Sequence, residues 1–171
     1  MLYDPKSGRM SPPRGTAPIR CALMGGGPGR EPPAETEPLI QLIRTRYHET
    51  HRREFPQAIE WAFKLDEHEL ANHLAFMLED LDNHQQREEQ VLFPMLLAGG
   101  GPMAKFPIGR MMAEHEAVED QLVRLRELAD ALRPDAGVEW EETVKLCRKL
   151  DSDLREHMRL ENEVLFPLFL D

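Results

Sequence analysis

Residues 84–94, HQQREEQVLFP, return with changes as residues 157–167, HMRLENEVLFP. Both stretches read His-x-x-x-Glu-x-x-Val-Leu-Phe-Pro, and they lie 73 positions apart. One turn of an α-helix rises about 5.4 Å, so residues four apart point to the same side. The repeat therefore predicts two helices that each carry a histidine and a glutamate on one face. We expect Val-Leu-Phe to pack the helix end and the proline to stop the helix.

The two copies of the repeat lie within four long helical segments, and glycine and proline occur mainly between these segments. The segments cover residues 37–67, 70–97, 108–132 and 138–170, and they are rich in Leu, Glu, Arg, Gln and Ala. Apolar residues recur three and four positions apart, and no segment alternates with period two. Short loops between long helices predict an all-α fold, an antiparallel up-down four-helix bundle. Pro56 lies inside the first segment and is expected to kink or restart that helix.

The first 36 residues differ from the rest in composition. They hold seven of the 14 prolines and six of the 11 glycines, without helical or strand periodicity. Such a segment buries too little apolar surface to offset its ordering entropy. We expect residues 1–36 to be a disordered Gly/Pro-rich leader, with Met24 as an alternative start, and residues 37–171 to form the bundle.

The charge distribution excludes several classes of partner. The chain has a net charge of −10, and residues 37–171 carry 16 basic against 28 acidic groups. An acidic body repels the phosphates of nucleic acid and anionic membrane surfaces. No apolar run approaches a membrane span or a signal-peptide core, and Cys21 and Cys147 form no disulfide framework. We expect a cytoplasmic protein that binds neither nucleic acid nor membrane; its oligomeric state stays open.

The other two segments each carry a histidine between acidic or polar neighbours, His48 and His115. In an up-down bundle, each can lie level with the His-x-x-x-Glu motif of a neighbouring helix. Imidazole and carboxylate suit iron, and a carboxylate can bridge two metals about 3.5–4 Å apart. The alternative is a set of solvated His/Glu pairs on charged helices. The predicted metal ligands are His48, His84, Glu88, His115, His157 and Glu161.

Residues 38–170 resemble a hemerythrin-like domain, most narrowly the di-iron domain of the repair-of-iron-centres proteins. The stretches that carry the resemblance are RYHETHR (46–52), HQQREEQVLFPM (84–95), PIGRMMAEH (107–115) and EHMRLENEVLFP (156–167). The resemblance implies two non-haem irons with oxo and carboxylate bridges. It makes Glu88 and Glu161 the bridging carboxylates and the four histidines terminal ligands.

The resemblance also implies a role in nitric-oxide and oxidative stress, in which damaged iron–sulfur clusters are repaired or supplied with iron. Iron ions, nitric oxide, oxygen and iron–sulfur proteins are then the expected partners. An alternative is an oxygen, nitric-oxide or iron sensor of the hemerythrin class without an iron-donor role. Catalysis by the di-iron pair is also left open.

Three departures from the family pattern bear on these expectations. The resemblance does not extend to the family's N-terminal domain with its adjacent cysteine pair, which we expect to be absent; Cys21 stands alone in residues 1–36. A further family histidine falls near His68 and Glu69, which makes His68 a weak candidate ligand. Glu119 stands where oxygen-carrying hemerythrins have a second histidine on the third helix, a change expected to disfavour reversible oxygen carriage.

Several remaining residues are expected to play structural parts. His51 is expected at the helix surface, with a role beside the metal or as a fifth ligand as the alternative. His73 is expected in the core or at a helix interface. Cys147 is expected to be buried and inert. The methionines expected to fill the core are Met77, Met95, Met111 and Met112.

Overall fold

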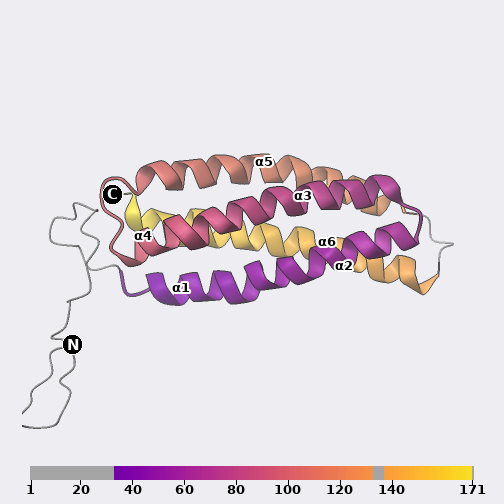
Figure 1. Cartoon of the computed structure of the whole chain (residues 1–171), viewed down its shortest axis with the longest axis horizontal. Helices are drawn as coiled ribbons and strands as arrows, with labels where there is room; N and C mark the ends of the chain where they lie inside the picture. Colours follow the sequence, from indigo (N-terminus) through magenta and orange to yellow (C-terminus); the bar gives the residue numbers. More distant parts are fainter. Residues whose placement is uncertain (1–32, 133–136, 171) are drawn as a thin grey trace, which may run out of the picture.

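The computed structural model describes residues 33–132 and 137–170, and within them every regular element is helical. The elements form four antiparallel rods (Figure 1). The first rod consists of α1 (Thr36–Leu42), the π-helical η1 (Ile43–His48) and α2 (Glu49–Lys64). The second consists of α3 (His68–Arg87), the π-helical η2 (Glu88–Leu92) and α4 (Phe93–Leu97). The third is α5 (Lys105–Asp130), and the fourth is α6 (Val138–Arg159), the π-helical η4 (Leu160–Leu165) and the 3-10 helix η5 (Phe166–Phe169).

This arrangement confirms the predicted all-α four-helix bundle. Each rod packs against two neighbours: α2 and α5 each contact both α3 and α6. The predicted leader, residues 1–36, lies almost entirely outside the described part of the chain, as does Cys21. No helix among the described residues is long and apolar enough to span a membrane.

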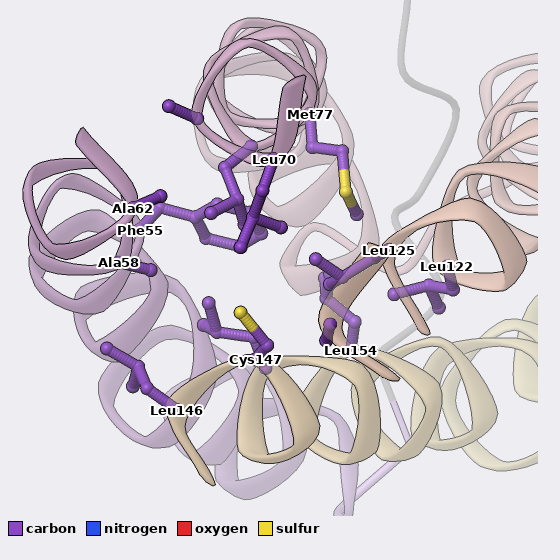
Figure 2. Packing of buried hydrophobic residues seen from close by; sticks show 14 of the residues in the cluster. Phe55, Ala58, Ala62, Leu70, Met77, Leu122, Leu125, Leu146, Cys147 and Leu154 are labelled. Carbon is purple, nitrogen blue, oxygen red and sulfur yellow. The ribbon is translucent and has the colours of Figure 1, made fainter. Parts of the chain in front are cut away.

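Two apolar clusters fill the interior. The larger lies between α2, α3, α5 and α6, and Figure 2 shows Phe55, Leu70 and Leu125 pointing into it. The smaller includes Ile43, Ile108 and residues of η2, α4, η4 and η5. On the first three rods, the predicted ligands fall between the residues of the two clusters in sequence; on the fourth, Glu161 does so, and His157 lies next to Met158, the last residue of the larger cluster. The bundle therefore holds a polar layer between two apolar ones.

Pro56 does not restart the first helix, contrary to that part of the prediction. α2 runs from Glu49 to Lys64 with Pro56 inside it. Proline removes one N–H from the helical ladder. The adjacent Phe55 and nearby Ala58 are fully buried in the larger cluster. Packing of the helix against its neighbours therefore outweighs the lost hydrogen bond.

The prolines of the repeat do not stop their helices either. Pro94 lies in the first turn of α4, and Pro167 lies in the first turn of η5. Each follows a π-helical segment, where the backbone bonds five residues back instead of four: the Phe93 N–H donates to the Glu88 carbonyl. This change of register lets the chain continue past a residue without an N–H.

The packing predicted for Val-Leu-Phe is correct for two of its three positions. Leu92 and Phe93 are buried in the smaller cluster, as are their counterparts in the second repeat. Val91 and Val164 are exposed at 53% and 37%. The valines thus face outward, and the leucine and phenylalanine hold the helix end.

Candidate metal centre

All six predicted ligands lie together inside the bundle. Every rod contributes, and each of the six is at most 5% exposed. Three of the four rods change to a π-helix at this level, and His48, Glu88 and Glu161 lie within those segments. A π-helical turn inserts an extra residue and re-aims the side chains beside it, and such turns are frequent at functional sites.

The four histidines form two pairs through their Nε2 atoms. The Nε2 atoms of His48 and His157 are 3.2 Å apart, and those of His84 and His115 are 3.1 Å apart. The first pair joins the first and fourth rods, and the second pair joins the second and third. Because each rod has two neighbours, a histidine can meet a partner that is not on the next rod along the chain.

Each carboxylate presents one oxygen to each histidine pair. Glu88 Oε2 lies 3.4 Å from His48 Nε2, and Glu88 Oε1 lies 3.2 Å from His84 Nε2. Glu161 Oε1 lies 3.0 Å from His157 Nε2, and Glu161 Oε2 lies 3.2 Å from His115 Nε2. Both glutamates therefore lie where a bridging carboxylate between two metals would lie.

Two overlapping groups of donors result, each with ligand atoms within 4.8 Å of one another. One group is His48, His157 and the two glutamates, and the other is His84, His115 and the same glutamates. Two imidazoles and two shared carboxylates per position suit a first-row transition metal such as iron.

The outer nitrogens of three histidines are held by polar partners. His48 Nδ1 lies 2.7 Å from Glu89 Oε1, and His84 Nδ1 lies 2.8 Å from Glu114 Oε2. His115 Nδ1 donates to Asn162 Oδ1 at 2.8 Å. An imidazole whose Nδ1 donates outward turns the lone pair of Nε2 inward, as a metal ligand requires. Each histidine pair includes one ring supported by a carboxylate.

Arginines connect these outer partners to the surface. Arg52 Nη2 lies 3.0 Å from Glu89 Oε1, and Arg87 Nη2 lies 2.6 Å from Glu114 Oε2. Although partial burial opposes it, hydrogen bonds from Arg87, His84 and Arg110 lower the pKa of Glu114 to about 2. Glu114 therefore stays ionised and keeps accepting from His84.

The hydrogen bonding of the buried carboxylate oxygens shows whether the site suits a bound cation. Both carboxylate oxygens of Glu88 and one of Glu161 are buried without a hydrogen-bond partner. Burial and the nearby Glu161 raise the pKa of Glu88. Although burial opposes it, the negative charge of Glu88, whose Oε1 lies 3.2 Å from His84 Nε2, raises the pKa of His84 to about 9. Because unpaired buried carboxylates are unfavourable, cations between the groups would satisfy them.

The pKa shifts of His48 and His157 are opposite in direction. Burial, with repulsion from His157, lowers the pKa of His48 to about 2, so this ring is neutral. Although burial opposes it, the charge of Glu161 raises the pKa of His157. Metal binding displaces such protons, which couples metal affinity to pH.

His51 is the clearest correction to the sequence reading. It is not at the helix surface but fully buried, with its ring centroid 5.7 Å from that of His157. Its Nδ1 lies 3.3 Å from Nε2 of Gln85. His51 lies about one helical turn after His48 and therefore faces inward as His48 does. The neighbouring arginines had suggested a surface position instead.

The six ligands together form a cage, and the other candidate ligands lie outside it. His68 is exposed and pairs with Asp66, while Glu69 pairs with Arg124. Glu119 pairs with Arg155 and does not enter the site, so it is not a charged ligand in place of a histidine. That correction removes the expected basis for disfavouring oxygen carriage.

The residues with predicted structural parts lie as follows. His73 is part-buried and its Nε2 donates to the backbone carbonyl of Gln121, at an interface between α3 and α5. Cys147 is buried in the larger cluster, and burial raises the pKa of its thiol to about 12. The methionines fill or flank the two clusters: Met77, Met95, Met111 and Met112.

Sequence reasoning assigned no role to the three outer partners. Glu89 follows Glu88, Glu114 precedes His115, and Asn162 follows Glu161. Adjacency to a candidate ligand was the available signal. It was insufficient because each partner contacts a histidine on another rod, and adjacency in the chain does not show which rods pack together.

The family model for the hemerythrin HHE cation-binding domain matches residues 43–169. The chain therefore belongs to the hemerythrin family. Family membership and the donor set make it a non-haem iron-binding domain.

Among individual proteins, the chain is similar to the iron-sulfur cluster repair protein YtfE of Yersinia pseudotuberculosis serotype IB (strain PB1/+) and of Yersinia pestis (strain Pestoides F). Identity to each is 37% over an alignment of 140 residues, which covers 75% of this chain and 63% of the relative. The chain thus spans less than two thirds of the length of these relatives. The similarity confirms the predicted closeness to the repair-of-iron-centres proteins.

Proposed function

We propose that this chain is a cytoplasmic di-iron protein that repairs damaged iron–sulfur clusters, or supplies iron to them, under nitric-oxide and oxidative stress. The observation that carries the proposal is the pair of carboxylates, each with one oxygen at each histidine pair. The relatives named for cluster repair support the biological role. Iron ions, nitric oxide or oxygen, and iron–sulfur proteins are the partners proposed.

The chain's own residues would hold two metals in a defined setting. His48 and His157 would hold one, His84 and His115 the other, and Glu88 and Glu161 would bridge both. Bound iron would supply one-electron redox chemistry and free coordination positions for a small gas or for exchange of the metal. Burial of all six donors excludes bulk water, and the outer partners keep the Nε2 lone pairs directed inward.

Metal content is the first test. The protein would be purified anaerobically, and iron per chain measured by elemental analysis beside circular dichroism. About two irons per helical chain would support the centre. A folded helical chain without metal would overturn both the ligand assignment and the function built on it.

The cellular role needs a separate test. A strain lacking the gene would be exposed to nitric oxide, and recovery of an iron–sulfur enzyme measured. Wild-type protein and Glu163→Gln, an exposed position, should restore recovery, while Glu161→Gln should not. Equal recovery with both variants would show that the metal centre is not needed for recovery, and would argue against the proposed role.

A further inference from the structure

His157 differs from the other three histidines of the cage. The Nδ1 atoms of His48, His84 and His115 each have a side-chain partner, whereas Nδ1 of His157 is buried without one. The ring itself is 1% exposed and is stacked on Tyr47, with centroids 5.6 Å apart. A ligand imidazole without an outer partner has no fixed tautomer.

A second buried polar group lies beside it. His51 is fully buried, its Nε2 has no partner, and its ring lies 5.7 Å from that of His157. Gln85 is also fully buried, and its Oε1 is unpartnered while its Nε2 meets His51 Nδ1. Three unpaired polar atoms therefore occur on side chains next to one another, in the wall of the cage.

We propose that His51 is a positioning residue for His157, joined to its Nδ1–H through one buried water, with Gln85 orienting the His51 ring. The proposal rests on the metal centre proposed above. In it, His51 does for His157 what Glu89, Glu114 and Asn162 do for the other three rings.

The donor and acceptor counts agree with this network. The Gln85 amide donates to His51 Nδ1, which puts the proton of a neutral His51 on Nε2. Burial lowers the pKa of His51 to about 3, so the ring is neutral. The water accepts from His51 Nε2–H and from His157 Nδ1–H, while Gln85 holds the opposite edge of the His51 ring. Buried waters make about three such bonds, and they bridge groups too far apart for direct contact.

A purely structural role makes different predictions. The His51 ring also packs near Tyr47 and Phe55, with centroids 6.2 and 6.3 Å away. If His51 only filled space, a ring of similar shape without nitrogens would serve equally well. His51→Phe keeps a planar ring and removes both polar atoms, whereas His51→Gln keeps a polar atom.

The experiment has two readouts: the rate of metal release, and the exchange and water contact of the His157 Nδ1 proton. Wild type, His51→Phe, His51→Gln and the control His73→Phe would be loaded with Fe²⁺ anaerobically, and release to a chelator timed. Outer partners of ligand histidines affect metal affinity about 10–100-fold. We expect His51→Phe to release iron about 10–100-fold faster, His51→Gln to restore most of the delay, and His73→Phe to match wild type.

Nitrogen-15 NMR of the zinc-loaded proteins supplies the second readout. His157 Nδ1–H should be protected from exchange and show a contact to bound water in wild type, and should lose both in His51→Phe. Should His51→Phe not fold, the wild-type spectrum and His51→Gln still decide the matter. Wild-type protein that binds no metal would defeat the proposed centre. Wild type that binds metal, with unchanged release and protection in His51→Phe, would defeat this inference alone.

Discussion

The bundle has two kinds of interior, and the contrast between them separates stability from function. Around Leu74 and Phe55 the side chains are apolar and fully buried, and they are held by burial alone. In the cage, the same four rods bury imidazoles and carboxylates, several of whose polar atoms lack partners. The first interior stabilises the fold whatever is bound. The second is satisfied only with cations, so its stability depends on metal.

The backbone shows the same division. Among the described residues, π-helical segments occur only at residues 43–48, 88–92 and 160–165, beside or within the cage. The helices that line the larger apolar cluster are regular. A regular helix suits repetitive packing, whereas a change of register re-aims individual side chains at some cost in hydrogen bonding. The irregular backbone is thus concentrated where specific donors must converge.

Loss of a bridging carboxylate should have the largest effect. Glu161→Gln removes a charge shared by both metal positions, so we expect metal content to fall from about two per chain to nearly none. Metal-free stability should fall as well, because the Glu161 carboxylate pairs with His157 and His115 inside the bundle, and removing one member of a buried pair leaves the others uncompensated. Elemental analysis and thermal unfolding of the metal-free protein measure both quantities.

Glu163→Gln is the matched control for this variant. Its side chain is 66% exposed on the same π-helical segment, and it should keep both metals. Full metal content in Glu161→Gln would contradict the view that the polar interior, unlike the apolar one, serves to bind metal.

A core substitution should lower stability without changing metal content. Leu74→Ala creates a cavity in the larger cluster, with an expected loss of about 2–5 kcal/mol in the free energy of unfolding. The loss should be the same with and without iron, and metal content per folded chain should not change. Denaturant unfolding of both forms measures it.

Phe76→Ala, on the same helix and at a 53% exposed position, serves as the control and should shift stability by less than about 0.5 kcal/mol. A Leu74→Ala protein that folds but loses its metal would show that the two interiors are coupled more tightly than proposed.

Removal of an outer partner should weaken metal binding without abolishing it. Glu89→Gln replaces the carboxylate that accepts from His48 Nδ1, and we expect metal affinity to fall about 10–100-fold. Asp82→Asn is the control, because Asp82 also faces Arg52 but touches no cage residue. Competition with a chelator of known affinity measures the change. Equal affinities for the two variants would mean that Glu89 does not support the ligand.

The sequence was sufficient for the bundle and for the proposed ligand set because both depend on spacing. The i, i+4 spacing of His84 and Glu88 places both on one helical face, and the repeat doubles the signal. His51 was misplaced because its arginine neighbours suggest a surface, whereas burial depends on which rods pack against it. The repeat prolines were read as stops because a sequence pattern does not show that a π-helical turn accommodates them.

Cys147 offers the smallest effect and probes the apolar interior by titration. Burial raises the pKa of its thiol to about 12, so the folded state keeps the proton that the unfolded state loses near pH 8.5. Because the unfolded form alone gains from ionisation, stability should fall as pH rises above 8.5. Between pH 8 and pH 9.5 this contribution is about 1 kcal/mol.

Cys147→Ala, compared on a Cys21→Ser background, should lack that part of the pH dependence, whatever its baseline stability. Denaturant unfolding at the two pH values measures the slope. The folded thiol should also resist a water-soluble disulfide reagent, since reaction requires the thiolate. Fast labelling of the native protein, or parallel slopes for the two proteins, would show that the apolar interior opens to water more readily than its packing implies.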